Sequence, residues 1–490
     1  MKILVVSFVD DNFGDNLIEI CFEKLLKVAL INHGFSCEDY LITRMGLKSI
    51  NKSYIVNSDI IFFAGGGLFG LSYLDFFKYL NEIVQTADKN NIPVIFSSTG
   101  INNMGMNAGE EEILVDFFNY SCIKAIGVRE NIDLFKKYAR KSEVEIVQVC
   151  DPAVWTKYVY NMDHINKQNT KLVGINVVRG GLFQDNGYAW RLADELDFLK
   201  AVTKMLERHG LEYRFYTNGS VLDNNALHYF AQKYNIADDK CVFPHTTREV
   251  IETINEFDTI LAFRMHSSII AYSFAIPSIA LAWNDKIPLF YKYIGYPERV
   301  LNYGEWNADN VLQILQKIMD DKYQFEKEKA YQEYLMSLYK YLYHVLKEFC
   351  VKGKNESAQF GFDSVITYLK KSDIGVNEDI FDMRVKLDKA EKQYLARFID
   401  LKSRDKEIKL NKKKNKELEI ELEKSKEAIS ALSKKNLELE KQKEKDREDY
   451  SKVINAQKKE IELLQKKFSV RLINYLKKRM KNRCNYDGYR

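Results

Sequence analysis

The first 300 residues alternate between short runs of apolar residues and longer amphipathic stretches. The expected strands are residues 3–8, 59–64, 94–97, 123–128, 145–149, 172–178, 212–216, 259–263 and 278–282. The expected helices include residues 16–33, 74–88, 110–119, 131–140, 190–208 and 226–234. Short apolar strands separated by amphipathic helices are typical of parallel sheets with helices on both faces. A polar stretch at 161–171 interrupts this rhythm, so we predict an α/β fold with two doubly wound, Rossmann-like lobes.

Beyond residue 300 the chain changes character, because all six prolines lie before that point and few glycines follow it. Proline and glycine interrupt regular structure, so their loss indicates long helices. We predict an N-terminal α/β lobe (1–165), a C-terminal α/β lobe (166–305), a helical extension (306–380), a coiled coil (381–468) and a basic amphipathic tail (469–490).

A heptad repeat begins at Ile408 in a highly charged segment, where residues 401–450 hold 29 charged side chains. The a and d positions are best filled with apolar residues between Leu418 and Leu439, and Asn415 falls at an a position. Asparagine at a favours a parallel dimer in fixed register, so we predict a homodimer formed through this coiled coil. A single solvated helix or an unstructured charged tail stays open, because only about half of the a and d positions are apolar.

The end of the sequence is strongly basic, with nine basic residues and one acid in residues 466–490. Phe468, Leu472, Leu476 and Met480 recur four positions apart, which predicts a short basic amphipathic helix. Such a helix fits an anionic membrane surface. A solubilising tail, or RNA contact without sequence specificity, is the alternative.

Composition and charge narrow the class of protein. A net charge of +4 in 490 residues excludes a wholesale basic nucleic-acid binder, and we expect no specific nucleic-acid partner. Seven scattered cysteines without CxxC spacing argue against a disulfide framework or a structural zinc site, and they fit a reducing compartment. The short apolar start is expected to be a strand rather than a signal peptide. We predict a cytoplasmic protein, with peripheral contact at the inner membrane face through the tail.

The first candidate binding site follows the first strand, where Gly14, Asp15 and Asn16 open a helix. Glycine permits close backbone approach, and a helix N-terminus presents unpaired N–H groups to an anion or to sugar hydroxyls. Asp15 and Asn16 would bind hydroxyl groups. The alternative is plain capping of the helix by one of these two side chains.

The second candidate is a buried strand that runs into Gly65, Gly66 and Gly67. The spacing is not GxGxxG, so a dinucleotide site is unsupported. Three successive glycines leave a bare backbone surface on which a ligand can lie. A tight turn is the alternative.

The third candidate is Arg129, which ends one strand, with Asp151 at the end of the next. The guanidinium would face the cleft at the carboxyl ends of the strands. Two roles stay equally open: direct contact with a ligand, or an ion pair with Asp151 that braces the lobe.

The fourth candidate is the sharpest, because Arg264, His266 and Ser267 fall where a strand of the second lobe passes into a helix. A guanidinium, an imidazole, a hydroxyl and a helix N-terminus at one point suit a phosphate or carboxylate. Lys286 and Arg179 follow neighbouring strands and would face the same cleft. The alternative is a structural histidine.

Five motifs in this order resemble those of the polysaccharide pyruvyl transferase family. They are Gly14-Asp15-Asn16, the strand from Asp59 into Gly67, Arg129 at a strand end, Asp151-Pro152-Ala153, and Arg264-Met265-His266 before a helix and Pro277. The similarity covers about residues 1–300. The chain departs from the family pattern at Glu130, Asp133 and Ala275, where Asp, Ser and Gly are usual.

The resemblance implies a fold similar to that of GT-B glycosyltransferases. It also implies transfer of a carboxyethylidene group from phosphoenolpyruvate to a saccharide or lipid-linked saccharide, forming a pyruvate ketal in cell-surface polysaccharide biosynthesis. No metal or organic cofactor is expected. His266, as a cationic general acid, would protonate the donor's methylene carbon, a role worth about 10²–10⁴-fold in rate. Arg264, with Lys286 or Arg179, would hold the donor's anionic groups, and Asp15 or Asn16 would orient the acceptor with the glycine backbone.

Two other functions stay open. The chain would be a glycosyltransferase that uses a nucleotide sugar if the second lobe placed acids beside a diphosphate site. It would be a non-catalytic scaffold if the coiled coil were its purpose. Intact Arg264 and His266 argue against the scaffold.

Overall fold

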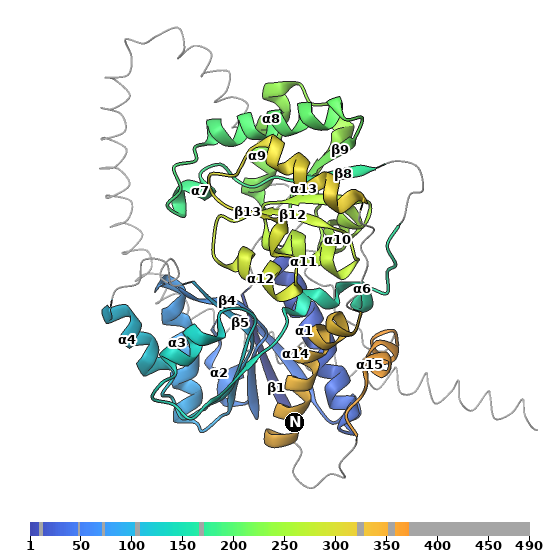
Figure 1. The fold of residues 1–490 in the computed structure, drawn as a ribbon. Coiled ribbons are helices and arrows are strands. Elements are labelled where there is room, and N and C mark those ends of the chain that lie inside the picture. The colour runs from blue at the N-terminus through green and yellow to red at the C-terminus, as the bar shows by residue number, and fades with distance from the viewer. Residues whose placement is uncertain are drawn as a thin grey trace, which may run out of the picture. The chain divides into compact units, whose positions relative to one another are not determined.

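The protein was analysed as a computed structural model, which describes residues 1–8, 13–47, 50–70, 74–102, 108–165, 171–320, 328–350 and 358–371. The predicted coiled coil and basic tail lie outside these residues, and both stay predictions. The described residues form two parallel sheets, each in its own lobe (Figure 1). The α/β fold with parallel sheets is therefore confirmed.

The first lobe is built on a parallel sheet of seven strands, in the order β2-β1-β3-β5-β6-β7, with β4 paired to β5. The strands are β1 (Lys2–Ser7), β2 (Leu41–Gly46), β3 (Ile60–Phe63), β4 (Gly66–Gly70), β5 (Val94–Asn102), β6 (Ile123–Val128) and β7 (Glu145–Gln148). The helices are α1 (Phe13–Asn32), α2 (Lys52–Val56), α3 (Leu74–Lys89), α4 (Ala108–Phe117) and α5 (Ile132–Tyr138). A 3₁₀ turn, η2 (Pro152–Trp155), and α6 (Thr156–Val159) lead out of the lobe.

The second lobe holds a parallel sheet of six strands in the order β10-β9-β8-β11-β12-β13. The strands are β8 (Leu172–Asn176), β9 (Glu212–Tyr216), β10 (Cys241–Val242), β11 (Thr259–Ala262), β12 (Ser278–Leu281) and β13 (Val300–Leu301). The helices and turns are α7 (Leu182–Asp185), α8 (Leu192–Arg208), α9 (Val221–Tyr234), η3 (Asp238–Lys240), α10 (Thr247–Asn255), α11 (Met265–Ser273), α12 (Lys286–Ile294) and η4 (Pro297–Arg299).

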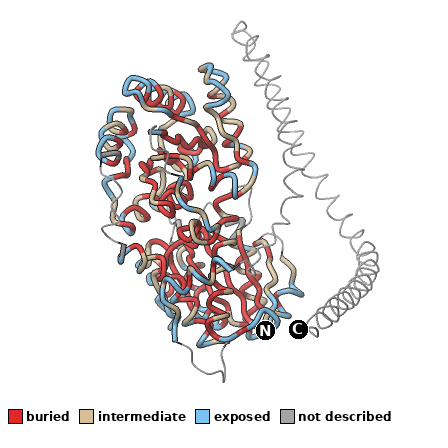
Figure 2. The backbone as a smooth tube through the Cα atoms, turned by 90° about the vertical axis from the view of Figure 1, so that its right-hand side faces the viewer, coloured by how far each residue is buried: buried red, intermediate tan, exposed pale blue. Residues whose placement is uncertain are grey.

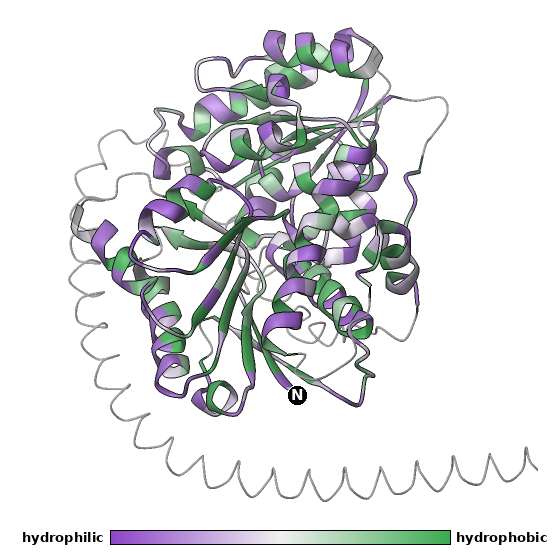
Figure 3. Cartoon of the chain, turned by 60° about the horizontal axis from the view of Figure 1, so that its bottom comes forward, coloured by the Kyte–Doolittle hydropathy of each residue, from purple (hydrophilic) through white to green (hydrophobic). Residues whose placement is uncertain are grey.

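The central strands of both sheets are apolar along their whole length because helices cover both faces. All four residues of β3 and all four of β11 are buried. Figure 3 shows strands of the sheets largely in the green of hydrophobic residues. One apolar core cluster runs from α1 in the first lobe into α11 in the second, so the lobes share buried surface (Figure 2).

The strand order places three of the four candidate sites at a reversal of the sheet. In the first sheet, the chain moves from β1 outward to β2 and then back to β3, on the other side of β1. In the second sheet, it moves outward from β8 through β9 and returns to β11. Ligands of doubly wound sheets bind at such reversals, outside the carboxyl ends of the strands. Gly14 follows β1, Gly65 follows β3, and Arg264 follows β11.

The helices that follow the second lobe are α13 (Ala308–Asp320), α14 (Glu328–Phe349) and α15 (Phe362–Leu369). The long helix α14 returns to the first lobe, where Figure 1 shows it beside the sheet in orange. The Tyr341 hydroxyl donates a hydrogen bond to the Phe96 carbonyl of β5 at 2.8 Å, and Tyr339 donates to Asn32 of α1 at 2.7 Å. After completing the second sheet, the chain therefore returns to the first lobe and packs against it.

Most expected elements are confirmed, and β6 and β9 match the predicted bounds. The sequence missed β2, β4, β10 and β13. The strands β10 and β13 are two residues each, too short to carry a pattern. The alternative of a tight turn does not hold for Gly66 and Gly67, because they begin β4, which pairs with β5.

Candidate functional site

His266 lies at the junction of the two lobes, in the first turn of α11. Its imidazole packs against Gly14 of α1 so closely that a Cβ at Gly14 would overlap Nδ1 and Cγ of the ring. The side chain is only 8% exposed, and its buried Nε2 has no hydrogen-bond partner among the described residues. Gly14, Asp15 and Asn16 belong to the first turn of α1, so they open a helix as expected.

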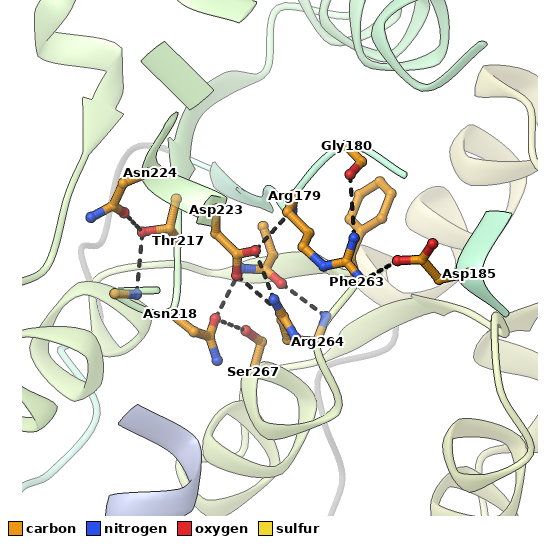
Figure 4. A network of polar contacts seen from close by, with 12 residues as sticks. Arg179, Gly180, Asp185, Thr217, Asn218, Asp223, Asn224, Phe263, Arg264 and Ser267 are labelled. Carbon is orange, nitrogen blue, oxygen red and sulfur yellow. Dashed lines mark hydrogen bonds and ion pairs between the residues drawn. The ribbon is translucent and has the colours of Figure 1, made fainter. Parts of the chain in front are cut away.

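Arg264, the residue before α11, is held by a carboxylate that the sequence analysis did not single out. Its Nε and Nη2 donate to the two carboxylate oxygens of Asp223 at 3.0 and 2.7 Å, as Figure 4 shows. Asp223 is fully buried and lies in the first turn of α9. It also accepts the backbone N–H of Arg179 at 2.8 Å. One edge of the Arg264 guanidinium is therefore committed to this ion pair, which fixes the direction of the side chain.

Ser267 is buried and belongs to the hydrogen-bond network that holds Arg264. Its buried hydroxyl donates to Asn218 Oδ1 at 2.7 Å, and Asn176 Nδ2 donates to the same oxygen at 2.9 Å. Asn176 Oδ1 in turn accepts the Arg264 backbone N–H at 2.9 Å. These contacts use the Ser267 hydroxyl to hold the β11–α11 junction, and we infer a positioning role for it rather than ligand contact.

Arg179 and Glu195 border this network on its outer side. The Arg179 guanidinium forms an ion pair with the exposed Asp185, so it is directed toward α7 (Figure 4). Glu195 of α8 is 2% exposed. Burial and the neighbouring Asp223 carboxylate raise its pKa to about 8.

The first lobe contributes a buried group of charges at the ends of β6 and β7. Arg129 forms ion pairs with Asp151 and Glu130, each at 2.7 Å, and all three side chains are at most 6% exposed. The expected Arg129–Asp151 pair is therefore present, with Glu130 as a second partner. Burial raises the pKa of Glu130, although its contacts with Arg129 and Lys286 oppose this.

Lys286 crosses from the first turn of α12 in the second lobe to the glycines of the first lobe. A Cβ at Gly67 would lie 2.5 Å from Lys286 Nζ and 3.9 Å from Arg129 Nη2. The missing side chain of Gly67 therefore makes room for a lysine of the protein itself. Burial lowers the pKa of Lys286, with Arg129 adding to the effect and Glu130 and Asp15 opposing it.

In the protein without ligand, the surroundings of His266 favour the neutral imidazole. Burial, together with Arg129, Arg264 and Lys286, lowers the pKa of His266 to about 4, although Asp151 opposes them. His266 is therefore neutral at pH 7 in the protein without ligand. An anion bound beside these three cations would act in the opposite direction and favour the charged ring.

We expect acidification to destabilise the protein through His266. The pKa of His266 is about 4 in the folded protein and 6.5 for an ordinary histidine, the value we take for the unfolded chain. Between these two pH values the unfolded chain therefore binds more protons than the folded protein. The free energy of unfolding therefore falls as the pH drops from 6.5 to 4, by about 3 kcal/mol in total. The contribution of His266 is measured by comparing how the free energy of unfolding depends on pH in the wild type and in His266→Gln. Parallel profiles would contradict the buried neutral imidazole, and His245→Gln, at an exposed site, is the control.

We also expect Gly14→Ala to destabilise the protein and displace His266. Alanine favours the helix more than glycine does, so any loss must come from the overlap with the imidazole. Overpacking of this kind costs about 1–3 kcal/mol. Thermal unfolding would measure it, with Gly361→Ala as the control, since no atom lies within 4 Å of a Cβ there. A Gly14→Ala protein as stable as the control would show that the ring moves freely.

The remaining predicted residues lie close to this junction. Asn16 is buried, and its Oδ1 has no hydrogen-bond partner among the described residues. Asp15 is half-buried and acts electrostatically on both Arg129 and Lys286. Gly65 has a φ of +141° that disfavours any side chain, and its backbone lies against the carbonyl of Ser98. The structure thus gathers Gly14, Asp15, Gly67, Arg129, His266 and Lys286 at the interlobe junction, with Arg264 close enough to act on His266.

Sequence reasoning missed Asp223, Asn218 and Asn176, which orient Arg264 and Ser267. A weak signal existed, because Asn218 comes two residues after the predicted strand 212–216, and Asp223 lies in the first turn of the helix that follows it. Their partners are 41 to 49 residues away in the sequence, and only the fold shows the pairing.

One exposed group in the described ranges has the composition of a metal site. Ligand atoms of Glu145, His344 and Glu348 lie within 4.8 Å of one another, on β7 and α14. Exposed groups of this kind are common on protein surfaces, and we assign no function to it.

Two doubly wound lobes with charged side chains gathered at their junction form a two-lobed α/β architecture of the kind in which ligands bind between the lobes. A family model described as "Polysaccharide pyruvyl transferase" matches residues 12–285, more than half of the chain. The chain belongs to the polysaccharide pyruvyl transferase family and is an enzyme of that type. None of the curated proteins matches it.

Several solved structures show a similar arrangement at low identity. The UDP-GlcNAc 2-epimerase of Neisseria meningitidis is 11% identical, with a TM-score of 0.45 over 71% of this chain and 100% of that one. MnaA of S. aureus, solved with UDP, is 13% identical, with a TM-score of 0.46 over 74% and 100%. The UDP-GlcNAc 2-epimerase of Methanocaldococcus jannaschii is 12% identical, with a TM-score of 0.45 over 71% and 100%. The fold of this chain is defined by its own strand order and not by these neighbours.

Among helices in the described ranges, none has the length and apolar content to cross a bilayer.

Proposed function

We propose that this enzyme transfers a carboxyethylidene group from phosphoenolpyruvate to two hydroxyls of a saccharide, and so forms a pyruvate ketal in cell-surface polysaccharide synthesis. Family membership supports the reaction class. The observation that supports the anionic donor is the approach of Lys286 Nζ and Arg129 Nη2 to one point beside Gly67, at 2.5 and 3.9 Å. Asp151 and Glu130 already pair with Arg129, and an anion bound near this point would be attracted by both Arg129 and Lys286.

The acids around the cations would orient them and leave the site ready for the donor. Asp223 holds Arg264, and Asp151 and Glu130 hold Arg129. The carboxylate and phosphate of phosphoenolpyruvate would then bind among Arg129, Lys286 and Arg264. Their negative charge would raise the pKa of His266, so proton uptake would accompany donor binding.

The reaction begins when His266, protonated on donor binding, gives its proton to the methylene carbon of phosphoenolpyruvate. That carbon becomes a methyl group, and C2 becomes an oxocarbenium centre. One sugar hydroxyl adds to C2, the bond between C2 and the phosphate oxygen breaks, and a second hydroxyl adds. Of the two hydroxyl protons released, one restores the proton used and the other leaves with phosphate. Asp15 and Asn16, at the N-terminus of α1, would orient the acceptor hydroxyls.

The direct test measures phosphate release from phosphoenolpyruvate with a panel of glycan acceptors, and detects the ketal by mass spectrometry. We expect one ketal for each phosphate. Turnover only with a nucleotide sugar would replace the proposal with a glycosyltransferase. No turnover with any donor would support a non-catalytic role.

We expect Lys286→Ala to weaken phosphoenolpyruvate binding at least about tenfold, since a charge-assisted contact is worth about 1.5–3 kcal/mol. Titration calorimetry would measure it. The matched control is Lys292→Ala, an exposed lysine on the same helix, α12. Equal affinity in the two variants would exclude Lys286 from the donor site.

A further inference from the structure

The charged group behind the interlobe junction borders a small cavity with an apolar far wall. Arg129, Glu130 and Asp151 line one side. Met265 and Ile269 of α11, Phe290 of α12 and Tyr334 of α14 line the rest. The cavity measures about 10 Å³, which is room for about one water molecule.

Tyr334 is fixed in this wall by bonds between α14 and the segment that carries Asp151. The Trp155 indole donates to the carbonyl of Leu335, the next residue, at 3.0 Å. The backbone N–H of Cys150 donates to Ser337 Oγ at 2.8 Å. The Tyr334 ring also packs on Tyr272 of α11, with centroids 6.4 Å apart. These hydrogen bonds hold α14, and with it Tyr334, next to the segment that carries Asp151.

Helix α14 lies beyond residue 285, where the match to the family model ends. Even so, it covers a cluster that includes Arg129 and borders the helix of His266. Among the lining residues, Tyr334 is the contribution of α14, beside the apolar side chains of α11 and α12. The Tyr334 side chain is the largest of these apolar lining groups.

We propose that Tyr334 is a water-excluding residue of this enzyme, which closes the cavity behind the Arg129–Glu130–Asp151 cluster and protects the reaction from hydrolysis. The protective role depends on the function proposed above, whereas the exclusion of water does not. Water that reached the oxocarbenium centre would add to C2 and lose a proton, and the C2–phosphate bond would break. The products would be pyruvate and phosphate instead of a ketal. Excluding water from the site therefore favours ketal formation over hydrolysis.

The test compares Tyr334→Leu with Tyr339→Leu, the same change on the same helix. Tyr339 is buried against Asn32 of α1 and does not line the cavity. Tyr334→Phe keeps the ring and is expected to behave as the wild type. If Tyr334→Leu fails to fold, Tyr334→Met replaces it, because the longer and more flexible methionine side chain adapts better to an irregular gap.

The first measurement needs no substrate. The imidazole of His266 is titrated by NMR in the full chain of each variant. We expect Tyr334→Leu to shift its midpoint upward by about one unit, a tenfold change in proton affinity, because water enters the buried cluster. An unchanged midpoint, or an equal shift in Tyr339→Leu, would overturn water exclusion.

The second measurement counts pyruvate, with lactate dehydrogenase, against ketal during turnover of phosphoenolpyruvate. We expect the ratio to rise severalfold in Tyr334→Leu and to stay at the wild-type level in Tyr334→Phe and Tyr339→Leu. A wild type that consumes no phosphoenolpyruvate would contradict the proposed function and with it the protective role, while the titration would still decide on water exclusion. Normal turnover with an unchanged ratio would overturn the protective role alone.

Discussion

Replacing His266 by alanine is expected to lower kcat by about 10²–10⁴-fold, the usual contribution of a positioned general acid. The ring lies at the interlobe junction, with Nε2 unpartnered among the described residues and Arg129, Arg264 and Lys286 acting on it. Removing it leaves these cations in place. The KM for phosphoenolpyruvate should therefore change much less than kcat.

The neutral resting state of His266 adds a second expectation. Because its pKa is about 4 without ligand, donor binding should take up a proton near pH 7. Calorimetry of phosphoenolpyruvate binding in buffers of different ionisation enthalpy would count that proton, and His266→Ala should abolish the uptake.

The matched control is His245→Ala, because His245 is exposed and its backbone N–H, rather than its ring, donates a hydrogen bond to Glu249. Normal turnover by His266→Ala would assign proton transfer to another group. A drop of equal size in both variants would point to a general loss of folding instead.

The second large effect is expected at Asp223, a residue that reaches the site only through Arg264. Asp223→Ala removes a fully buried carboxylate and leaves the mostly buried Arg264 guanidinium without this partner. Breaking a buried ion pair in this way costs about 3–5 kcal/mol. Chemical denaturation would measure the loss in the free energy of unfolding.

Asp223 also orients Arg264, so we expect a raised KM for phosphoenolpyruvate in any Asp223 variant that folds. Asp223→Asn keeps the shape and one acceptor oxygen, and its KM should lie between those of the wild type and Asp223→Ala. The control is Asp185→Ala, which removes the exposed partner of Arg179 and should cost only about 0–1 kcal/mol. Equal losses at the two aspartates would show that burial does not strengthen the Arg264 pair.

Local patterns predicted the strands well where an apolar run is long enough to be read. Strands β6 and β9 match their predicted bounds, and each lies inside its sheet between two neighbouring strands. Strand β4 was missed because Gly66 and Gly67 carry no side chain that could show a strand pattern, and its pairing with β5 is decided by the neighbouring strand.

The sequence predicted individual residues of the candidate site but not the contacts between them. The sequence picked out Arg264, His266, Arg129 and Lys286 from their positions after strands. It could not show that Lys286 of α12 lies over Gly67 of β4, since the two residues are far apart in the chain. The same distance in sequence concealed Asp223, which holds Arg264.

By itself, the order of apolar and polar residues determined the parallel sheets, and short motifs pointed to the family, because both depend on neighbours a few positions apart. Only the tertiary structure decided the charge state of His266 and the partners of each cation. A pKa depends on burial and on the charges that surround a group in space, and those here come from both lobes. The place of Tyr334 was decided in the same way, by the return of α14 to the first lobe.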